Sequence, residues 1–273
     1  MTFRYTENEL REIFEDALCA FDECLDSGIR KDNTLLRFFL PEEGKTVYEN
    51  FCSKHFPKYL RENYDLDGYF ESFAAQAFVG EDDVNGIMFR RDLDFPPHEI
   101  FFLFLHELSH IFCTRNEIEG GHFFDRYCMG SGIEDGMMNA GYAIWREAIA
   151  DIMADSIKSE YASQRLADVK SEVMRMYRML SIENPDSKKQ MSLIIAYIMI
   201  SGEVAGTETW DAAEKAIRKT IRFDNELIYV ILRMIFANLH DSPFWCITPD
   251  YISGLGEVYL ALLAHKRMET LMM

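Results

Sequence analysis

The segment from Glu99 to Phe112 constrains the fold most, because it is strongly apolar yet contains three ionisable side chains near its centre. Pro96 and Pro97 precede it, and proline is well tolerated only in the first turn of a helix. The pattern therefore predicts a helix that begins at these prolines. Apolar residues on most of its sides indicate that the helix is buried, so the polar groups within it need partners.

The three central side chains of this helix are His106, Glu107 and His110. Histidines four residues apart lie one helical turn apart, so both imidazoles can reach a single tetrahedral zinc ion. Glu107 is rotated about 60° from His110, which puts its carboxylate beside the metal, where a general base belongs. The alternative is a buried helix whose three polar groups only hydrogen-bond to one another.

A catalytic zinc usually has three protein ligands and a water, so another segment must supply the third ligand. Glu147, Asp151 and Asp155 recur every four residues and share one helical face among small and branched apolar residues. We predict Glu147 as the third zinc ligand, with Asp151 accepting a hydrogen bond from a ligating histidine. Two alternatives stay open: Asp151 as the ligand with Glu147 supporting it, or a solvated acidic face.

The two segments together resemble a known family. HELSH at residues 106–110, followed by EAIAD at residues 147–151, resembles the gluzincin metallopeptidases, in which an HExxH helix pairs with a later helix bearing ExxxD. The run from Gly86 to Asp92 into HELSH is more particularly similar to the ImmA/IrrE-like metallopeptidases. The resemblance spans about residues 85 to 160 and implies zinc-dependent hydrolysis of peptide bonds in a protein or peptide substrate.

Carried over by position, the resemblance implies that the zinc ligands are His106, His110 and Glu147, that Glu107 is base and acid, and that Asp151 supports the site.

The sequence also departs from the family pattern. Ser109 stands where the HExGH form has glycine, and no residue matches the histidine and tyrosine that assist thermolysin-like catalysis. Tyr142 and His122 are the candidates to stabilise an oxyanion, since either could donate a hydrogen bond. The competing functional hypothesis is a non-catalytic zinc-containing helical protein, whose acidic C-terminal half docks a basic partner.

Hydrophobic periodicity predicts helices over most of the remaining chain. A capping box at Thr6 and Glu9 begins the first helix, which continues to Gly28. The other predicted helices cover residues 47–55, 142–161, 167–180, 187–201, 208–221, 224–239 and 251–270. A β-ribbon is expected within residues 69–93, and six glycines between residues 120 and 141 indicate a loop.

The predicted fold class is α+β, mainly α-helical and zincin-like, with a small β-sheet over the HExxH helix. We expect a zincin-like core over residues 1–183 and a helical C-terminal region over residues 184–273, packed on the same core. The boundary is placed at Asn184-Pro185-Asp186.

Composition narrows the partners and the compartment. The net charge of −18 over 273 residues would repel a phosphate backbone, so nucleic acid is not an expected partner. The longest apolar run, from Leu193 to Ile200, is too short to span a bilayer. The first ten residues lack a signal-peptide pattern and the six cysteines form no dense framework, which predicts a cytoplasmic protein. The sequence does not indicate the oligomeric state.

Overall fold

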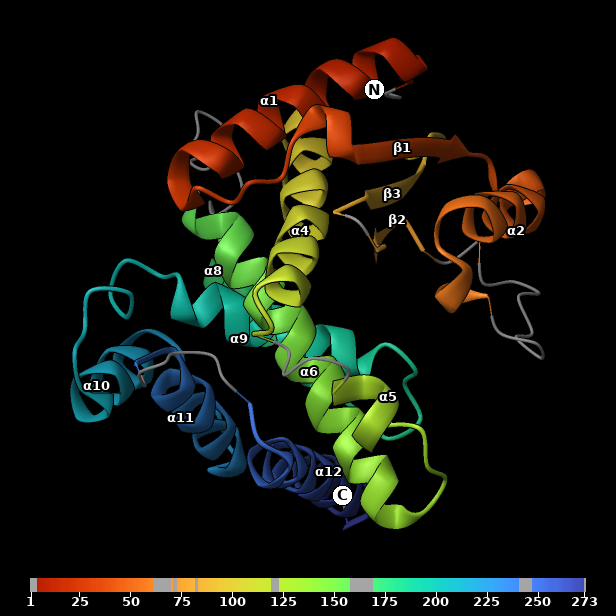
Figure 1. Cartoon of the computed structure of the whole chain (residues 1–273). Coiled ribbons are helices and arrows are strands. Elements are labelled where there is room, and N and C mark those ends of the chain that lie inside the picture. Colours follow the sequence, from red (N-terminus) through yellow and green to blue (C-terminus); the bar gives the residue numbers. More distant parts are fainter. Residues whose placement is uncertain are drawn as a thin grey trace. The chain divides into compact units, whose positions relative to one another are not determined.

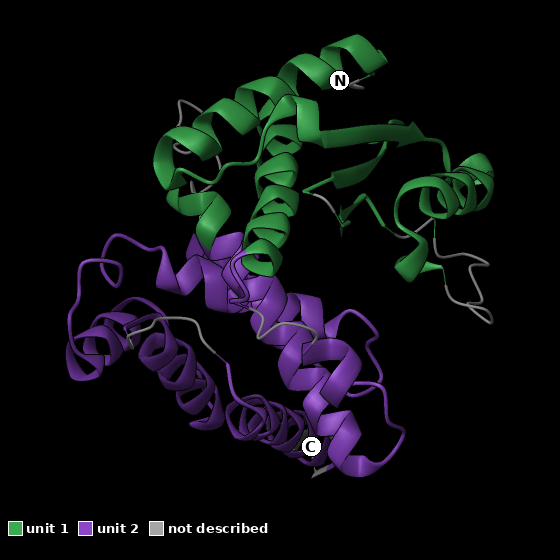
Figure 2. Ribbon diagram, in the orientation of Figure 1, with its two compact units in different colours: residues 1–115, 153–165 green, residues 116–152, 166–273 purple. Residues whose placement is uncertain are grey.

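The computed structural model describes residues 4–60, 70, 73–81, 83–118, 123–157, 169–240 and 247–272. It contains two compact units, coloured separately in Figure 2: residues 1–115 with 153–165, and residues 116–152 with 166–273. The boundary predicted at residue 184 falls inside the second unit. The structure is mainly helical with a small three-stranded sheet, as the predicted α+β class requires.

The first unit combines helices with the sheet (Figure 1). Its elements are α1 (Glu7–Leu25), β1 (Thr34–Phe39), α2 (Gly44–His55), β2 (Ala75–Val79), β3 (Asn85–Arg90) and α4 (Pro97–Arg115). Short 3-10 turns cover Lys31–Asn33, Pro41–Glu43 and Pro57–Tyr59.

The sheet has the strand order β1-β3-β2, so β3 is central. β2 and β3 form the predicted antiparallel ribbon, with Ala77 opposite Ile87. β1 runs parallel to β3, with Leu36 opposite Ile87. The sequence analysis did not predict β1, because Thr34–Phe39 lacks the apolar–polar alternation of a half-buried strand. The segment reads instead as a short apolar run that only Arg37 interrupts.

Aromatic side chains fill both faces of this sheet. On one face, the ring of Phe89 stacks on Phe104 of α4 at a centroid distance of 4.4 Å, and Phe104 meets Phe14 of α1 at 5.4 Å. On the other face, Phe78 stacks on Phe56 at 5.4 Å above α2. Helix α4 is therefore a fully supported central helix of the first unit, as its apolar sequence predicts.

The regular secondary structure described in the second unit is entirely helical. Its elements are α5 (Phe123–Tyr127), α6 (Ile133–Ser156, whose last turn belongs to the first unit), α8 (Val169–Met179), α9 (Ser187–Met199), α10 (Trp210–Thr220), α11 (Leu227–His240) and α12 (Pro249–Met272). Within it, Trp145 is fully buried, and its indole N–H donates to Asn238 Oδ1 at 2.8 Å.

The predicted loop between residues 120 and 141 is wrong in two places. The short helix α5 covers Phe123–Tyr127, and α6 begins at Ile133 and includes Gly136 and Gly141. Gly141 has a packing role. A Cβ atom built there would lie 2.0 Å from the carbonyl oxygen of Ile252 in α12, and one built at Gly256 would lie 1.8 Å from the carbonyl oxygen of Met137. These glycines permit two helices to cross in backbone contact. From composition alone, clustered glycines predict a loop instead.

Helices elsewhere start and end within a few residues of the predicted limits. Thr6 caps α1 through the predicted capping box with Glu9. None of the helices in the described part of the chain is long and apolar enough to cross a membrane.

Candidate metal centre

Helix α4 holds the HExxH residues and is fixed at both ends. At its N-terminus, the carbonyl of Pro96 accepts hydrogen bonds from the backbone N–H groups of Glu99 and Ile100 at 3.0 and 3.2 Å. At its C-terminus, the Arg115 guanidinium donates to Asn85 Oδ1 and to the carbonyl of Val84, both at 3.0 Å. Arg115 thus ties the last turn of the helix to the start of β3. Sequence reasoning missed this positioning residue, because a single arginine at a helix end carries no specific signal.

His106 and His110 face each other across one turn of α4. Their Nε2 atoms lie 3.0 Å apart, and the ring planes are nearly perpendicular at 89°. His110 is 4% exposed and His106 is half-buried. Two nitrogens that each lie about 2.0–2.1 Å from a tetrahedral zinc ion are about 3.3 Å apart, so the observed separation suits two ligands of one ion. It also suits a hydrogen bond between the rings.

Glu107 is 5% exposed, which is unusual for a carboxylate. Helical geometry rotates it about 100° from His106 and about 60° from His110, so it lies on the His110 side of the pair. Ser109 is fully buried, and its hydroxyl donates to the carbonyl of Leu105 at 2.8 Å. Because that bond satisfies the hydroxyl within the helix, serine fits where the resemblance leads us to expect glycine.

The continuous helix α6 supplies the carboxylates. Near its end, Met153 Sδ lies 3.6 Å from Cys113 Sγ of α4. Glu147 precedes Met153 by about 9 Å along the helix axis. Candidate ligand atoms of His106, His110 and Glu147 all lie within 4.8 Å of one another, a group that could hold a metal ion.

The other predicted site residues are placed as follows. Asp151 is 6% exposed, one turn after Glu147, and is not a member of the three-residue group. Its assignment as support or as ligand stays a prediction. Tyr142 is buried, and its ring stacks on Phe123 at a centroid distance of 5.5 Å. His122 lies outside the described residues. Asp155, the third acid of the stripe, is half-buried.

The donor set fits a zinc ion. Two imidazole nitrogens and one carboxylate oxygen are ligands that zinc accepts, and three protein ligands leave a fourth position for water or substrate. Glu147 also lies 3.9 Å from the guanidinium of Arg146, with both side chains about one-third exposed. This partly solvated ion pair is weak and competes little with a divalent ion.

Comparison with known proteins adds no assignment: no protein family, curated protein or solved structure matches the chain. The chemistry of the site therefore rests on its own residues.

Proposed function

We propose that this protein is a zincin-like, zinc-dependent metallopeptidase that cleaves a protein or peptide substrate. The observation that supports the proposal most is the group formed by His106, His110 and Glu147, together with the burial of Glu107, which is next to His106 in the sequence. Three ligands with an adjacent carboxylate are the set that metal-assisted hydrolysis needs. The resemblance to gluzincins supports the same assignment.

The proposed reaction needs a group that moves protons beside the metal. When bound, zinc polarises a carbonyl and lowers the pKa of water. Glu107 takes a proton from the attacking water and returns it to the leaving amine. Asp151 positions a ligating histidine by accepting a hydrogen bond from its ring N–H. Burial of Glu107 excludes bulk water that would compete for its proton.

The second candidate function is that of a helical binding protein without a metal. It is supported by the 3.0 Å separation of the two histidine nitrogens, because one ring can donate a hydrogen bond to the other. Metal analysis separates these two functions. We would measure zinc by mass spectrometry on the untagged protein and on the double variant His106→Ala, His110→Ala. His98→Ala is the matched control, since His98 lies in the first turn of the same helix.

Metallopeptidase function predicts about one zinc per chain, lost in the double variant and kept in His98→Ala. Absence of zinc from the wild type after reconstitution would reject the proposal and leave a helical binding protein.

Catalysis is tested by Glu107→Gln, with Glu99→Gln in the first turn of α4 as the matched control. Cleavage would be followed with fluorescent casein and a quenched peptide library. We expect Glu107→Gln to keep its zinc and to lose cleavage by at least about 100-fold, because the proton-transfer group is removed. Zinc binding with no cleavage by the wild type would favour the non-catalytic zinc protein.

A further inference from the structure

The outer edge of β1 has backbone groups that pair with no other strand in the described part of the chain. Among the described residues, β1 is an edge strand of the sheet and pairs with β3 on one side only. The carbonyl of Phe39 accepts from the backbone N–H of Arg91, just after β3, at 3.0 Å. Because N–H and C=O groups of successive strand residues point to opposite sides, those of Leu36 and Phe38 point away from β3. These two residues can pair with a further strand.

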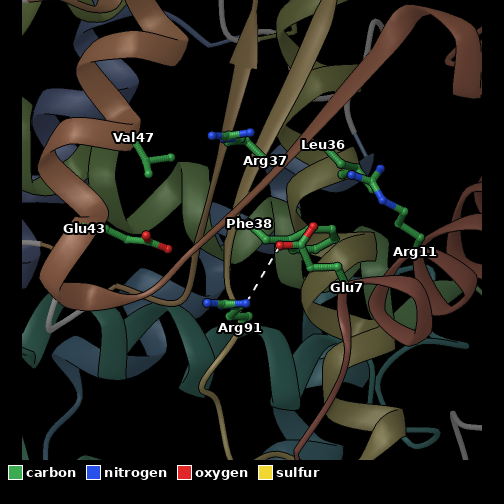
Figure 3. Close-up of a pocket in the computed structure, with 8 residues that line it drawn as sticks. All are labelled: Glu7, Arg11, Leu36, Arg37, Phe38, Glu43, Val47 and Arg91. Atoms are coloured by element: carbon green, nitrogen blue, oxygen red, sulfur yellow. Dashed lines mark ion pairs between the residues drawn. The ribbon is translucent and has the colours of Figure 1, made fainter.

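A groove runs along this edge between α1 and α2. It comprises two adjoining cavities of about 240 and 460 Å³, which share Arg11, Leu36, Arg37 and Val47 as lining residues. Figure 3 shows the smaller cavity, with Arg11 of α1 on one side of β1 and Val47 of α2 on the other. The backbone groups of β1 that face outward therefore open into a space that can admit another chain.

Cations dominate the groove, although acidic residues outnumber basic ones in the chain by 46 to 28. Arg11, Arg37 and Lys54 line it and are exposed. No described carboxylate forms an ion pair with any of the three. Arg11 lies over the Phe38 ring at 5.2 Å. None of the described residues that line the larger cavity is acidic.

The acids of the smaller cavity already have partners. Glu7 lies 3.9 Å from the Arg91 guanidinium, and Glu43 accepts a hydrogen bond from the backbone N–H of Leu40 at 3.1 Å. The pKa of the neighbouring His55 is lowered mainly by burial and, to a smaller extent, by the positive charge of Lys54. The groove is thus a local positive site on an acidic protein.

We propose that this groove binds an extended acidic segment of a partner protein, which adds to β1 as a fourth strand. Its backbone pairs with Leu36 and Phe38, and its carboxylates meet Arg37 and Arg11. A second copy of this chain is a poor occupant, because antiparallel pairing of two β1 edges would bring their Arg37 side chains together. The proposal concerns a surface apart from the histidine pair and does not require a metal.

The test is fluorescence anisotropy with the full-length protein and a labelled peptide of alternating threonine and glutamate. The matched probe alternates threonine and lysine. We expect the glutamate peptide to bind and the lysine peptide not to bind. The glutamates of this peptide lie on one face of an added strand, whereas Arg37 and Arg11 lie on opposite faces of β1, because Arg11 covers the ring of Phe38. Binding should therefore weaken at least about tenfold in whichever of Arg37→Glu and Arg11→Glu changes the face that the glutamates meet, and also with added salt. Lys45→Glu is the control, since Lys45 is exposed on α2 but lines neither cavity.

A second probe tests strand addition itself. Two versions of the glutamate peptide are N-methylated at alternate amides, one at the odd positions and the other at the even positions. Each version lacks N–H donors on one edge of the strand. The version that lacks the donors facing β1 should lose about tenfold in affinity, and the other should bind normally. Equal affinity for both methylated peptides would overturn strand addition. Unchanged affinity in Arg37→Glu and Arg11→Glu, with native circular dichroism, would overturn the site. If sedimentation shows a wild-type dimer that Arg37→Glu dissociates, a second copy is the occupant and the proposal fails.

Discussion

The two compact units build their cores in different ways. In the first unit, aromatic rings pack on both faces of a small sheet, as Phe89 does on Phe104 and Phe78 on Phe56. In the second, helices pack on helices, and α6 crosses α12 in backbone contact at Gly141 and Gly256. A ring-filled core is visible in a sequence as clustered phenylalanines. A glycine crossing has no such signal, because the same residues also mark turns.

The comparison extends to helices α4 and α6. Both have modest amphipathicity and many buried residues. In such helices the polar exceptions are informative, since each buried charge needs a partner. His110 and Glu107 in α4, and Asp151 in α6, are exceptions of this kind. Four predictions test the contrast, from the largest expected effect to the smallest.

The largest effect concerns the carboxylates of α6. Glu147→Gln removes a proposed ligand and should weaken zinc binding by more than about 100-fold, whereas Asp151→Asn should cost about 10- to 100-fold, as expected for a supporting partner. Competition with a chromophoric chelator measures both, with Glu134→Gln in the exposed first turn of α6 as the control. The reverse order would make Asp151 the ligand, the alternative that the sequence leaves open.

The glycine crossing of the second unit gives the next effect. Gly256→Ala should destabilise the protein by about 3 kcal/mol, because the new methyl group would overlap the carbonyl of Met137. Gly254→Ala on the same helix meets only Met234 Cε at 3.6 Å and should stabilise by about 0.5–1 kcal/mol through helix propensity. Urea unfolding followed by circular dichroism compares them. A neutral Gly256→Ala would mean that the two helices do not cross there.

The third prediction concerns the loss of stability at alkaline pH, to which a buried tyrosine contributes in one unit and a buried cysteine in the other. Burial raises the pKa of Tyr259 in the second unit from 10.0 to about 12, while a hydrogen bond with Ser187 partly opposes the shift. The unfolded chain then loses this proton at lower pH than the folded one. The contribution of Tyr259 to the free energy of unfolding is fully present below pH 10. It falls by about 2–3 kcal/mol as the pH rises toward 12.

Tyr259→Phe should remove this part of the alkaline decline in urea midpoints. In the first unit, burial raises the pKa of Cys52 from 9.0 to about 12, so Cys52→Ala should remove a decline that begins near pH 9. If the pH profile of both variants parallels that of the wild type, these groups do not control the alkaline limb.

The smallest effect lies at the helix caps. Thr6 in the first unit donates its backbone N–H to Glu9 and accepts the Glu9 N–H on its hydroxyl, at 2.7 and 3.3 Å. Thr209 in the second unit accepts one long bond of 3.4 Å from the N–H of Ala212. Thr6→Ala should cost about 1 kcal/mol and Thr209→Ala about 0.5 kcal/mol. Thermal unfolding measures the difference, and an equal cost would refute the ranking.

The accuracy of prediction depended on how local each signal was. The capping box of α1, the ribbon of β2 and β3, and the two-proline start of α4 all depend on neighbouring residues, and each was confirmed. Strand β1 was missed because only its parallel partner, about 50 residues away, distinguishes it from any short apolar run. The start of α6 was wrong because Gly136 and Gly141 are locally unfavourable in a helix.

By itself, the sequence determined that His106 and His110 share one face of a buried helix with Glu107 beside them, because helical spacing fixes those relations locally. The sequence predicted Glu147 as the third ligand but left Asp151 as an alternative, and only the tertiary structure grouped Glu147 with that pair. It alone also placed Arg11, Arg37 and Lys54 along an open strand edge. The physical reason is that contacts between residues distant in the chain depend on packing, which no local periodicity encodes.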